Sequence, residues 1–278
     1  MPQSLVDAVS NYVIDNVTSG VELNGSENSA SIGIKFYIPT TDKNDFRPGL
    51  KEYLSQIVNT EMPVAPKIQE STVLAQDWVK SYRESIQPVM IDNVICVRPP
   101  WGKATSGIKH DIIIEPKMAF GTGHHETTRT CLHLIFKYFK KDGRFLDFGC
   151  GSGVLSILAD KLGAGYIKAI DYDMIAIENT NENFGINQVK SNQAVEYGSF
   201  EKTQNERPFD MVCANLAKSD IIENFGILKN LIMENGHLIL SGILDKEQSE
   251  IDQIIINSQM PVVEYIREGE WLTYCLGK

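Results

Sequence analysis

From residue 144 to the end of the chain, short apolar runs alternate with stretches that have helical spacing. This alternation predicts a parallel sheet covered by helices on both faces, because parallel strands need helical crossovers and are buried on both sides. Two last short strands are predicted to return as a hairpin at the end of the sheet. The expected strands are 144–150, 166–172, 194–199, 209–216, 237–244, 262–267 and 271–276, and the expected helices are 153–163, 173–184, 218–233 and 245–258.

The N-terminal part has a different pattern, which predicts a small α+β domain. Apolar residues four apart indicate a helix over residues 4–19, and strict alternation from Ile32 to Ile38 indicates a half-buried strand. A second helix is predicted over 48–60 and a last strand near 67–73, after the breakers Pro63 and Pro66. We therefore expect a substrate-recognition domain at 1–73, a linker and lead-in at 74–117, and a catalytic domain at 118–278.

Composition limits the partners of the chain. Its net charge of -10 would repel a phosphate backbone, so we expect no direct contact with nucleic acid and a preference for a basic protein. The five cysteines are scattered and lie mostly in apolar runs, which favours reduced thiols. No secretion signal or apolar span long enough for a membrane is apparent. We expect a cytoplasmic monomer that does not bind membranes.

The strongest motif is LDFGCGSG at residues 146–153. Gly149, Gly151 and Gly153 let the chain turn sharply after a strand and let a ligand touch the backbone, where a Cβ would collide. A dinucleotide motif needs a third glycine at position 154, which is Val154 here. The motif therefore favours S-adenosylmethionine over a bound pyrophosphate, although a glycine turn without a ligand is the alternative.

An acid follows at the end of the next predicted strand. Asp171 lies 22 residues after Gly149, where a carboxylate can accept hydrogen bonds from both hydroxyls of a ribose. The alternative is that an acid here only caps the next helix, as aspartate does well. We assign the ribose to Asp171 and the cap to Asp173.

The segment MAFGTGHHETTR at residues 118–129 precedes another predicted helix. Thr127 and Thr128 place hydroxyls and free backbone N–H groups at its start, a natural site for a carboxylate such as that of methionine. The neighbouring His124, His125 and Glu126 are consecutive, so they diverge around a helix, and none has a histidine four residues on. We therefore predict no metal site.

Asn215 ends an otherwise apolar strand, FDMVCAN. An unpaired amide at a buried strand end costs about 1–3 kcal/mol, so Asn215 is expected to bind the acceptor nitrogen or the cofactor. The alternative is that asparagine only forms the turn.

Together these motifs resemble the methyltransferases of ribosomal protein L11, the PrmA family. The resemblance rests on AFGTGHHETTR (119–129), LDFGCGSGVLSI (146–157), AIDYD (169–173), ANL (214–216), LSGIL (240–244), and EGEW near the end. It implies a class I, Rossmann-like methyltransferase fold with a seven-stranded, mostly parallel sheet, and an N-terminal domain resembling a ferredoxin-like fold. It also implies S-adenosylmethionine as donor and amino groups of that ribosomal protein as acceptors. By matching motif, the cofactor residues are Thr128, Gly149, Asp171 and Asn215, and Gly151 belongs to the same loop.

Methyl transfer to an amine requires the amine to be neutral. A lysine costs about 4–5 kcal/mol to deprotonate at pH 7, whereas a terminal amine costs only about 1–1.5 kcal/mol. His125 and Glu126 are the candidate bases near the predicted site, with Asn215 as the third catalytic candidate. The alternatives are a methyltransferase for lysines of another protein, a nicotinamide-dependent oxidoreductase, and a binding protein that kept the fold without activity.

Overall fold

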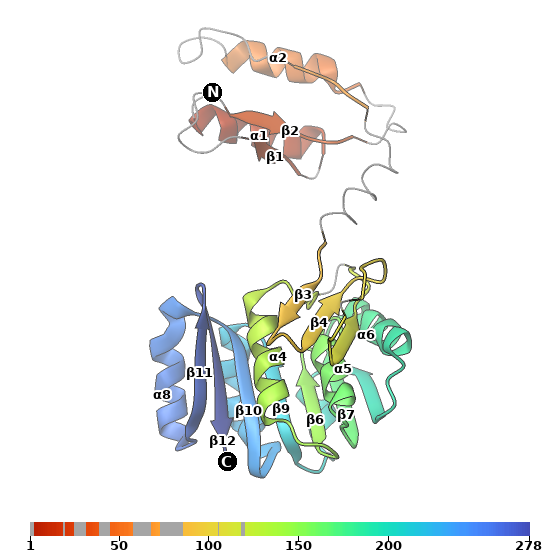
Figure 1. Cartoon of the computed structure of the whole chain (residues 1–278). Coiled ribbons are helices and arrows are strands. Elements are labelled where there is room, and N and C mark those ends of the chain that lie inside the picture. Colours follow the sequence, from red (N-terminus) through yellow and green to blue (C-terminus); the bar gives the residue numbers. More distant parts are fainter. Residues whose placement is uncertain are drawn as a thin grey trace. The chain divides into compact units, whose positions relative to one another are not determined.

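The computed structural model describes residues 3–18, 20–24, 32–38, 45–57, 68–72, 86–104, 106–117 and 120–278. The chain divides into two compact units, Met1–Leu74 and Ala75–Lys278, which we describe separately (Figure 1). No helix among the described residues is long and apolar enough to cross a membrane.

The first unit has the order α1 (Gln3–Asn16), β1 (Glu22–Asn24), β2 (Gly33–Lys35), α2 (Arg47–Ile57). The two strands pair antiparallel, and both predicted helices are present. Val9 and Val13 of α1 pack against Leu50 and Leu54 of α2, as their four-residue spacing predicts. The prediction of a strand near 67–73 is wrong for residues 68–72, which are exposed and have no regular secondary structure.

The second unit begins with a three-stranded sheet that we did not predict. Its strands are β3 (Val89–Ile91), β4 (Ile95–Arg98) and β5 (His110–Ile113), with β3 antiparallel and β5 parallel to β4. These strands span only three or four residues each, too few for a clear alternating pattern. The segment predicted as a lead-in therefore contains its own sheet, whose apolar side chains join the core of the second unit.

The main sheet has seven strands in the order β11-β12-β10-β9-β6-β7-β8. The strands from β10 to β8 in this order are parallel, and β12 is antiparallel to both of its neighbours, which confirms the predicted sheet and its terminal return. The strand bounds are β6 Arg144–Phe148, β7 Tyr166–Asp171, β8 Asn192–Tyr197, β9 Phe209–Asn215, β10 Ile232–Leu244, β11 Val262–Glu268 and β12 Trp271–Gly277.

Helices cover both faces of this sheet (Figure 1). Successive strand residues point to opposite faces, so Phe145 packs in one apolar cluster and Leu146 in the other. Helices α4 (Glu126–Tyr138), α5 (Val154–Lys161) and α6 (Met174–Asn187) contribute to the first cluster. Helices α7 (Lys218–Asn230) and α8 (Gln248–Ser258) contribute to the second.

The structure corrects the predicted end of α7 and the predicted start of β10. The helix predicted to reach residue 233 ends at Asn230, and β10 begins at Ile232 rather than at residue 237. The reason is tertiary, because Ile232 pairs with Phe209 at the start of β9 and is buried. A short 3-10 turn, Asp245–Glu247, precedes α8.

Candidate active site

The glycine loop after β6 has the backbone that its sequence predicts. Gly149, Gly151 and Gly153 have φ angles of 78°, 54° and 79°, in the left-handed region that favours glycine. A Cβ on Gly151 would lie 2.5 Å from the carbonyl oxygen of Phe120, a contact that backbone atoms cannot relieve cheaply. The loop therefore tolerates no side chain at this point.

Two side chains of α6 hold the carbonyl groups of this loop. The Thr180 hydroxyl donates to the Gly151 carbonyl oxygen at 3.0 Å, and the Asn183 amide donates to that of Ser152 at 2.9 Å. With both carbonyl oxygens bonded to the protein, the conformation of the loop is fixed before any ligand arrives.

Asp171, at the end of β7, lies beside the glycine loop. Its Oδ2 accepts a 2.9 Å hydrogen bond from the Gly151 N–H, and its Oδ1 accepts one of 2.9 Å from the Asp173 N–H. A carboxylate has about four acceptor positions, so Asp171 has acceptor capacity left for a ligand. Asp173 is the N-cap of α6, accepting from the Ile175 N–H, which confirms the predicted cap, whereas the ribose role of Asp171 stays a prediction.

The segment from Phe120 to His125 connects the glycine loop to α4. The Ser152 N–H donates to the Phe120 carbonyl oxygen at 2.8 Å, and the Ser152 hydroxyl donates to that of Gly121 at 2.6 Å. His125 is the N-cap residue of α4, and its side chain accepts from the Thr127 N–H. The start of α4 is thus tied to the loop after β6.

Thr127 and Thr128 are both buried in the first turn of α4, but their hydroxyls have different surroundings. The Thr127 hydroxyl accepts a 3.2 Å hydrogen bond from the Asn215 side chain. The Thr128 hydroxyl is buried and has no hydrogen-bond partner among the described residues. An unpaired buried hydroxyl is unfavourable, so Thr128 keeps unused hydrogen-bonding capacity in the first turn of α4.

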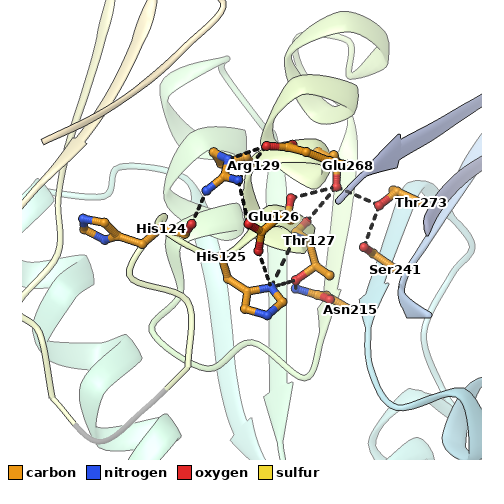
Figure 2. A network of polar contacts seen from close by, with 10 residues as sticks. His124, His125, Glu126, Thr127, Arg129, Asn215, Ser241, Glu268 and Thr273 are labelled. Carbon is orange, nitrogen blue, oxygen red and sulfur yellow. Dashed lines mark hydrogen bonds and ion pairs between the residues drawn. The ribbon is translucent and has the colours of Figure 1, made fainter. Parts of the chain in front are cut away.

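Asn215 stands at the end of β9, half-buried, where its register partner on β10 is Ser241 (Figure 2). A Cβ on Gly149 would lie 3.8 Å from the backbone carbonyl oxygen of Asn215. The end of β9 therefore lies next to the glycine loop after β6, as expected for neighbouring parallel strands.

The Glu126 carboxylate lies between Arg129 and His125, with one oxygen 3.9 Å from Nδ1 of His125 (Figure 2). Arg129 lies 3.2 Å from a Glu126 oxygen, donates to Glu268 at 2.9 Å from Nε, and also donates to the His124 carbonyl oxygen. A hydrogen bond from its own backbone N–H, together with Arg129, lowers the pKa of Glu126. A lowered pKa makes a carboxylate a weaker base. Among the described residues, no cluster of side chains could hold a metal ion.

Three side chains near these groups were not singled out from the sequence. The rings of Phe120 and Trp271 lie edge-on to the His125 ring, with centroid distances of 5.1 and 4.8 Å. Asp147, two residues before Gly149, is fully buried, and burial raises its pKa to about 7 although Ser156 donates two hydrogen bonds to it. An acid within the apolar run FLDF was a visible signal for Asp147, whereas only contacts in the fold reveal the two rings.

The sequence-predicted residues are thus distributed over three strand ends and one helix start. Gly149, Gly151 and Asp171 meet at the loop after β6, and Asn215 joins Thr127 and His125 at the start of α4. Thr128 lies in the same helical turn, and the Glu126 carboxylate lies 3.2 Å from Arg129 and 3.9 Å from Nδ1 of His125. Ligands of open α/β sheets bind outside the carboxyl ends of the strands, where the three strand-end residues stand.

Comparisons with known proteins agree with this architecture. The family model for ribosomal protein L11 methyltransferase (PrmA) matches residues 10–278. A protein of Campylobacter concisus named ribosomal protein L11 methyltransferase is 34% identical over 84% of this chain and 82% of its own length. One of the same name from a Nitratiruptor species is 32% identical over 97% of this chain and 91% of its own length.

A solved structure is similar as well. The crystal structure of a ribosomal protein L11 methylase from Lactobacillus delbrueckii subsp. bulgaricus superposes with a TM-score of 0.63 at 25% identity. The match covers 68% of this chain and 97% of that one. None of these relatives carries the name of a nicotinamide-dependent oxidoreductase, and that alternative has no support.

Proposed function

Since this chain belongs to the ribosomal protein L11 methyltransferase (PrmA) family, we propose that it transfers methyl groups from S-adenosylmethionine to amino groups of ribosomal protein L11. The observation that carries the proposal is the meeting of four groups at the carboxyl edge of one parallel sheet. These are the glycine loop, the Asp171 carboxylate, the first turn of α4 and the Asn215 amide.

The residues at this edge fit the donor. The glycine loop leaves backbone exposed to a ligand, and Asp171 keeps acceptor capacity for ribose hydroxyls. The unpartnered Thr128 hydroxyl and the start of α4 suit a carboxylate, because N–H groups and the positive end of the helix dipole favour negative charge there. When bound, S-adenosylmethionine supplies a methyl group on a positively charged sulfur.

The protein has to orient the acceptor amine and hold it without its extra proton. Asn215 is the polar side chain at the strand end beside the glycine loop, and we assign it to the amine. Displacement at a methyl group needs no covalent nucleophile, so orientation supplies much of the rate. A terminal amine needs little further help. A lysine must be desolvated or deprotonated, and its deprotonation costs about 4–5 kcal/mol at pH 7.

The first unit, Met1–Leu74, is proposed to choose the acceptor. It shares no residue with the groups that form the donor site, all of which lie between Phe120 and Trp271. The net charge of -10 suits a basic ribosomal protein and opposes a phosphate backbone, so we propose that the enzyme meets its acceptor without touching nucleic acid.

The direct test is a methylation assay with methyl-labelled S-adenosylmethionine, purified ribosomal protein L11 and an extract that lacks L11. Labelled L11, with mass spectrometry locating the methyl groups on amines, is the expected result. Label on a different protein of the extract would overturn the substrate. Donor binding without label on any protein would indicate a binding protein rather than an enzyme.

A further inference from the structure

We propose that Thr127 is a positioning residue, whose hydroxyl fixes both the amide orientation of Asn215 and the tautomer of His125. In this arrangement Asn215 offers its side-chain oxygen, Oδ1, to the acceptor amine, and His125 offers an Nε2–H group to a ligand. The inference rests on the proposed function, but it concerns hydrogen bonds that exist before any ligand binds. Figure 2 shows the three side chains together.

The direction of this hydrogen-bond chain follows from one bond that has only one possible donor. The Thr127 backbone N–H lies 3.3 Å from Nδ1 of His125, and a backbone N–H can only donate. Nδ1 must therefore be unprotonated. The Thr127 hydroxyl lies 2.9 Å from the same Nδ1, so it too must donate to that nitrogen. This leaves the hydroxyl oxygen free to accept from the Asn215 amide, at 3.2 Å.

For His125 the consequence is that the neutral ring carries its proton on Nε2. The Nδ1 lone pair accepts from the Thr127 N–H at the start of α4, and a proton on Nδ1 would break this cap. Nε2 has no hydrogen-bond partner among the described residues, and the Phe120 and Trp271 rings lie edge-on to the imidazole. His125 is therefore a hydrogen-bond donor, and this assignment replaces the hypothesis of a general base.

For Asn215 the consequence is that its NH2 group is turned toward α4 and its Oδ1 is left without a partner among the described residues. An amide oxygen accepts, and a primary amine presents N–H groups to it. Accepting one of these hydrogen bonds orients the nitrogen lone pair, and this orientation is the contribution that transfer to a methyl group needs. An Asn215 side chain flipped by half a turn would donate from NH2 to the amine lone pair, which would then be unavailable for attack on the methyl group.

The neighbouring hydroxyl provides an internal contrast. Thr127 and Thr128 are adjacent, but a helix separates adjacent residues by about 100°, so their hydroxyls face different groups. The Thr127 hydroxyl is bonded to two side chains, whereas that of Thr128 has no partner. We assign Thr127 to acceptor orientation and Thr128 to donor binding. Loss of the Thr127 hydroxyl should therefore lower kcat, whereas loss of the Thr128 hydroxyl should raise the Kd of the donor.

The kinetic test compares Thr127→Val, Thr127→Ser and Thr128→Val in the full chain, with L11 as acceptor. Thr127→Val should lower kcat by about 10- to 100-fold and leave the Kd for S-adenosylmethionine within about threefold. Thr127→Ser should restore kcat because it keeps the hydroxyl, and Thr128→Val should weaken donor binding instead. Thr130→Val is the matched control, because it removes another buried hydroxyl of α4, which bonds to the Thr127 backbone carbonyl and to Thr273 but not to the side chains of Thr127, His125 or Asn215. Wild-type kcat in Thr127→Val, or equal loss in Thr127→Ser, would overturn the proposal.

A second measurement does not depend on turnover, and it reads the tautomer in the wild-type protein itself. The ¹⁵N resonances of the histidine ring in the wild-type protein without ligand distinguish the two neutral tautomers, and His125→Gln assigns the signal. The proton is expected on Nε2. A proton on Nδ1 would overturn the proposal, even in a protein that binds donor and methylates nothing, which is how failure of the proposed function itself would appear.

Discussion

The backbone N–H of Gly151 donates a 2.9 Å hydrogen bond to Oδ2 of Asp171, which follows it by 20 residues in the sequence. The acid proposed to hold the ribose therefore also holds the glycine loop in place. Asp171→Ala removes hydrogen bonds to a charged group, worth about 1.5–3 kcal/mol, so donor affinity should fall about 10- to 150-fold. Calorimetry on the folded variant measures the change.

Asp173→Ala is the control for Asp171. It removes the cap of α6 and should cost about 1 kcal/mol of stability while leaving donor affinity unchanged, because its carboxylate, among the residues that the structure describes, bonds only to the start of that helix. An Asp171→Ala protein that binds the donor as tightly as the wild type would refute the ribose assignment.

Thr128→Val should change stability and donor binding in opposite directions. The hydroxyl is buried without a partner, so replacing it with a methyl group should leave the free energy of unfolding unchanged or raise it, by up to about 1 kcal/mol. If the donor carboxylate uses this hydroxyl, affinity should fall about tenfold. Thermal unfolding and calorimetry on the same sample separate the two effects, and tight donor binding in the variant contradicts the assignment.

Gly151→Ala should damage both the fold and the donor site. The residue has a left-handed φ of 54°, and its Cβ would lie 2.5 Å from the Phe120 carbonyl oxygen. We expect a loss of about 1–3 kcal/mol in the free energy of unfolding and weaker donor binding. Gly226→Ala is the matched control, since that position in α7 has open space and should gain about 0.5–1 kcal/mol. Equal donor affinity in both variants would show that the loop does not approach the ligand.

Asp147 should make stability depend on pH. Burial raises its pKa from 3.8 to about 7, so between these values the folded state holds a proton that the unfolded state has lost. Stability from this group therefore decreases as pH rises through the window, by about 1.4 kcal/mol per pH unit, and levels off above pH 7. Asp147→Asn should remove this slope, which urea unfolding from pH 4 to 8 measures. Parallel pH curves for the two proteins would show that Asp147 is ionised in the folded state throughout.

Removal of residues 1–74 should separate donor binding from acceptor choice. The second unit holds the whole proposed donor site, so a fragment starting at Ala75 should bind S-adenosylmethionine with unchanged affinity. Methylation of L11 should fall by about 100-fold or more, because tethering the acceptor beside the site supplies a high effective concentration. A fragment that methylates L11 as fast as the full chain would place acceptor choice in the second unit.

Local patterns in the sequence were enough to predict the sheet and the glycine loop after β6. The alternation of strands and helices after residue 144 predicts that the main strands are parallel, and the terminal return was also predicted. Both depend on periodicity within a few residues, which is why they are readable from the chain alone. The end of α7 was misplaced because Ile232 belongs to β10 through its pairing with Phe209, a contact between segments more than 20 residues apart.

The sequence by itself determined which residue types stand at the strand ends and at the start of α4, including Gly149, Asp171 and Asn215. Only the tertiary structure decided which of two adjacent threonines contacts Asn215, a residue 88 positions away from Thr127. It also decided that the lone pair of His125 is engaged by α4. The physical reason is that composition and spacing fix local geometry, whereas the direction of a hydrogen bond depends on which partners the packed sheet and helices bring within 3 to 4 Å.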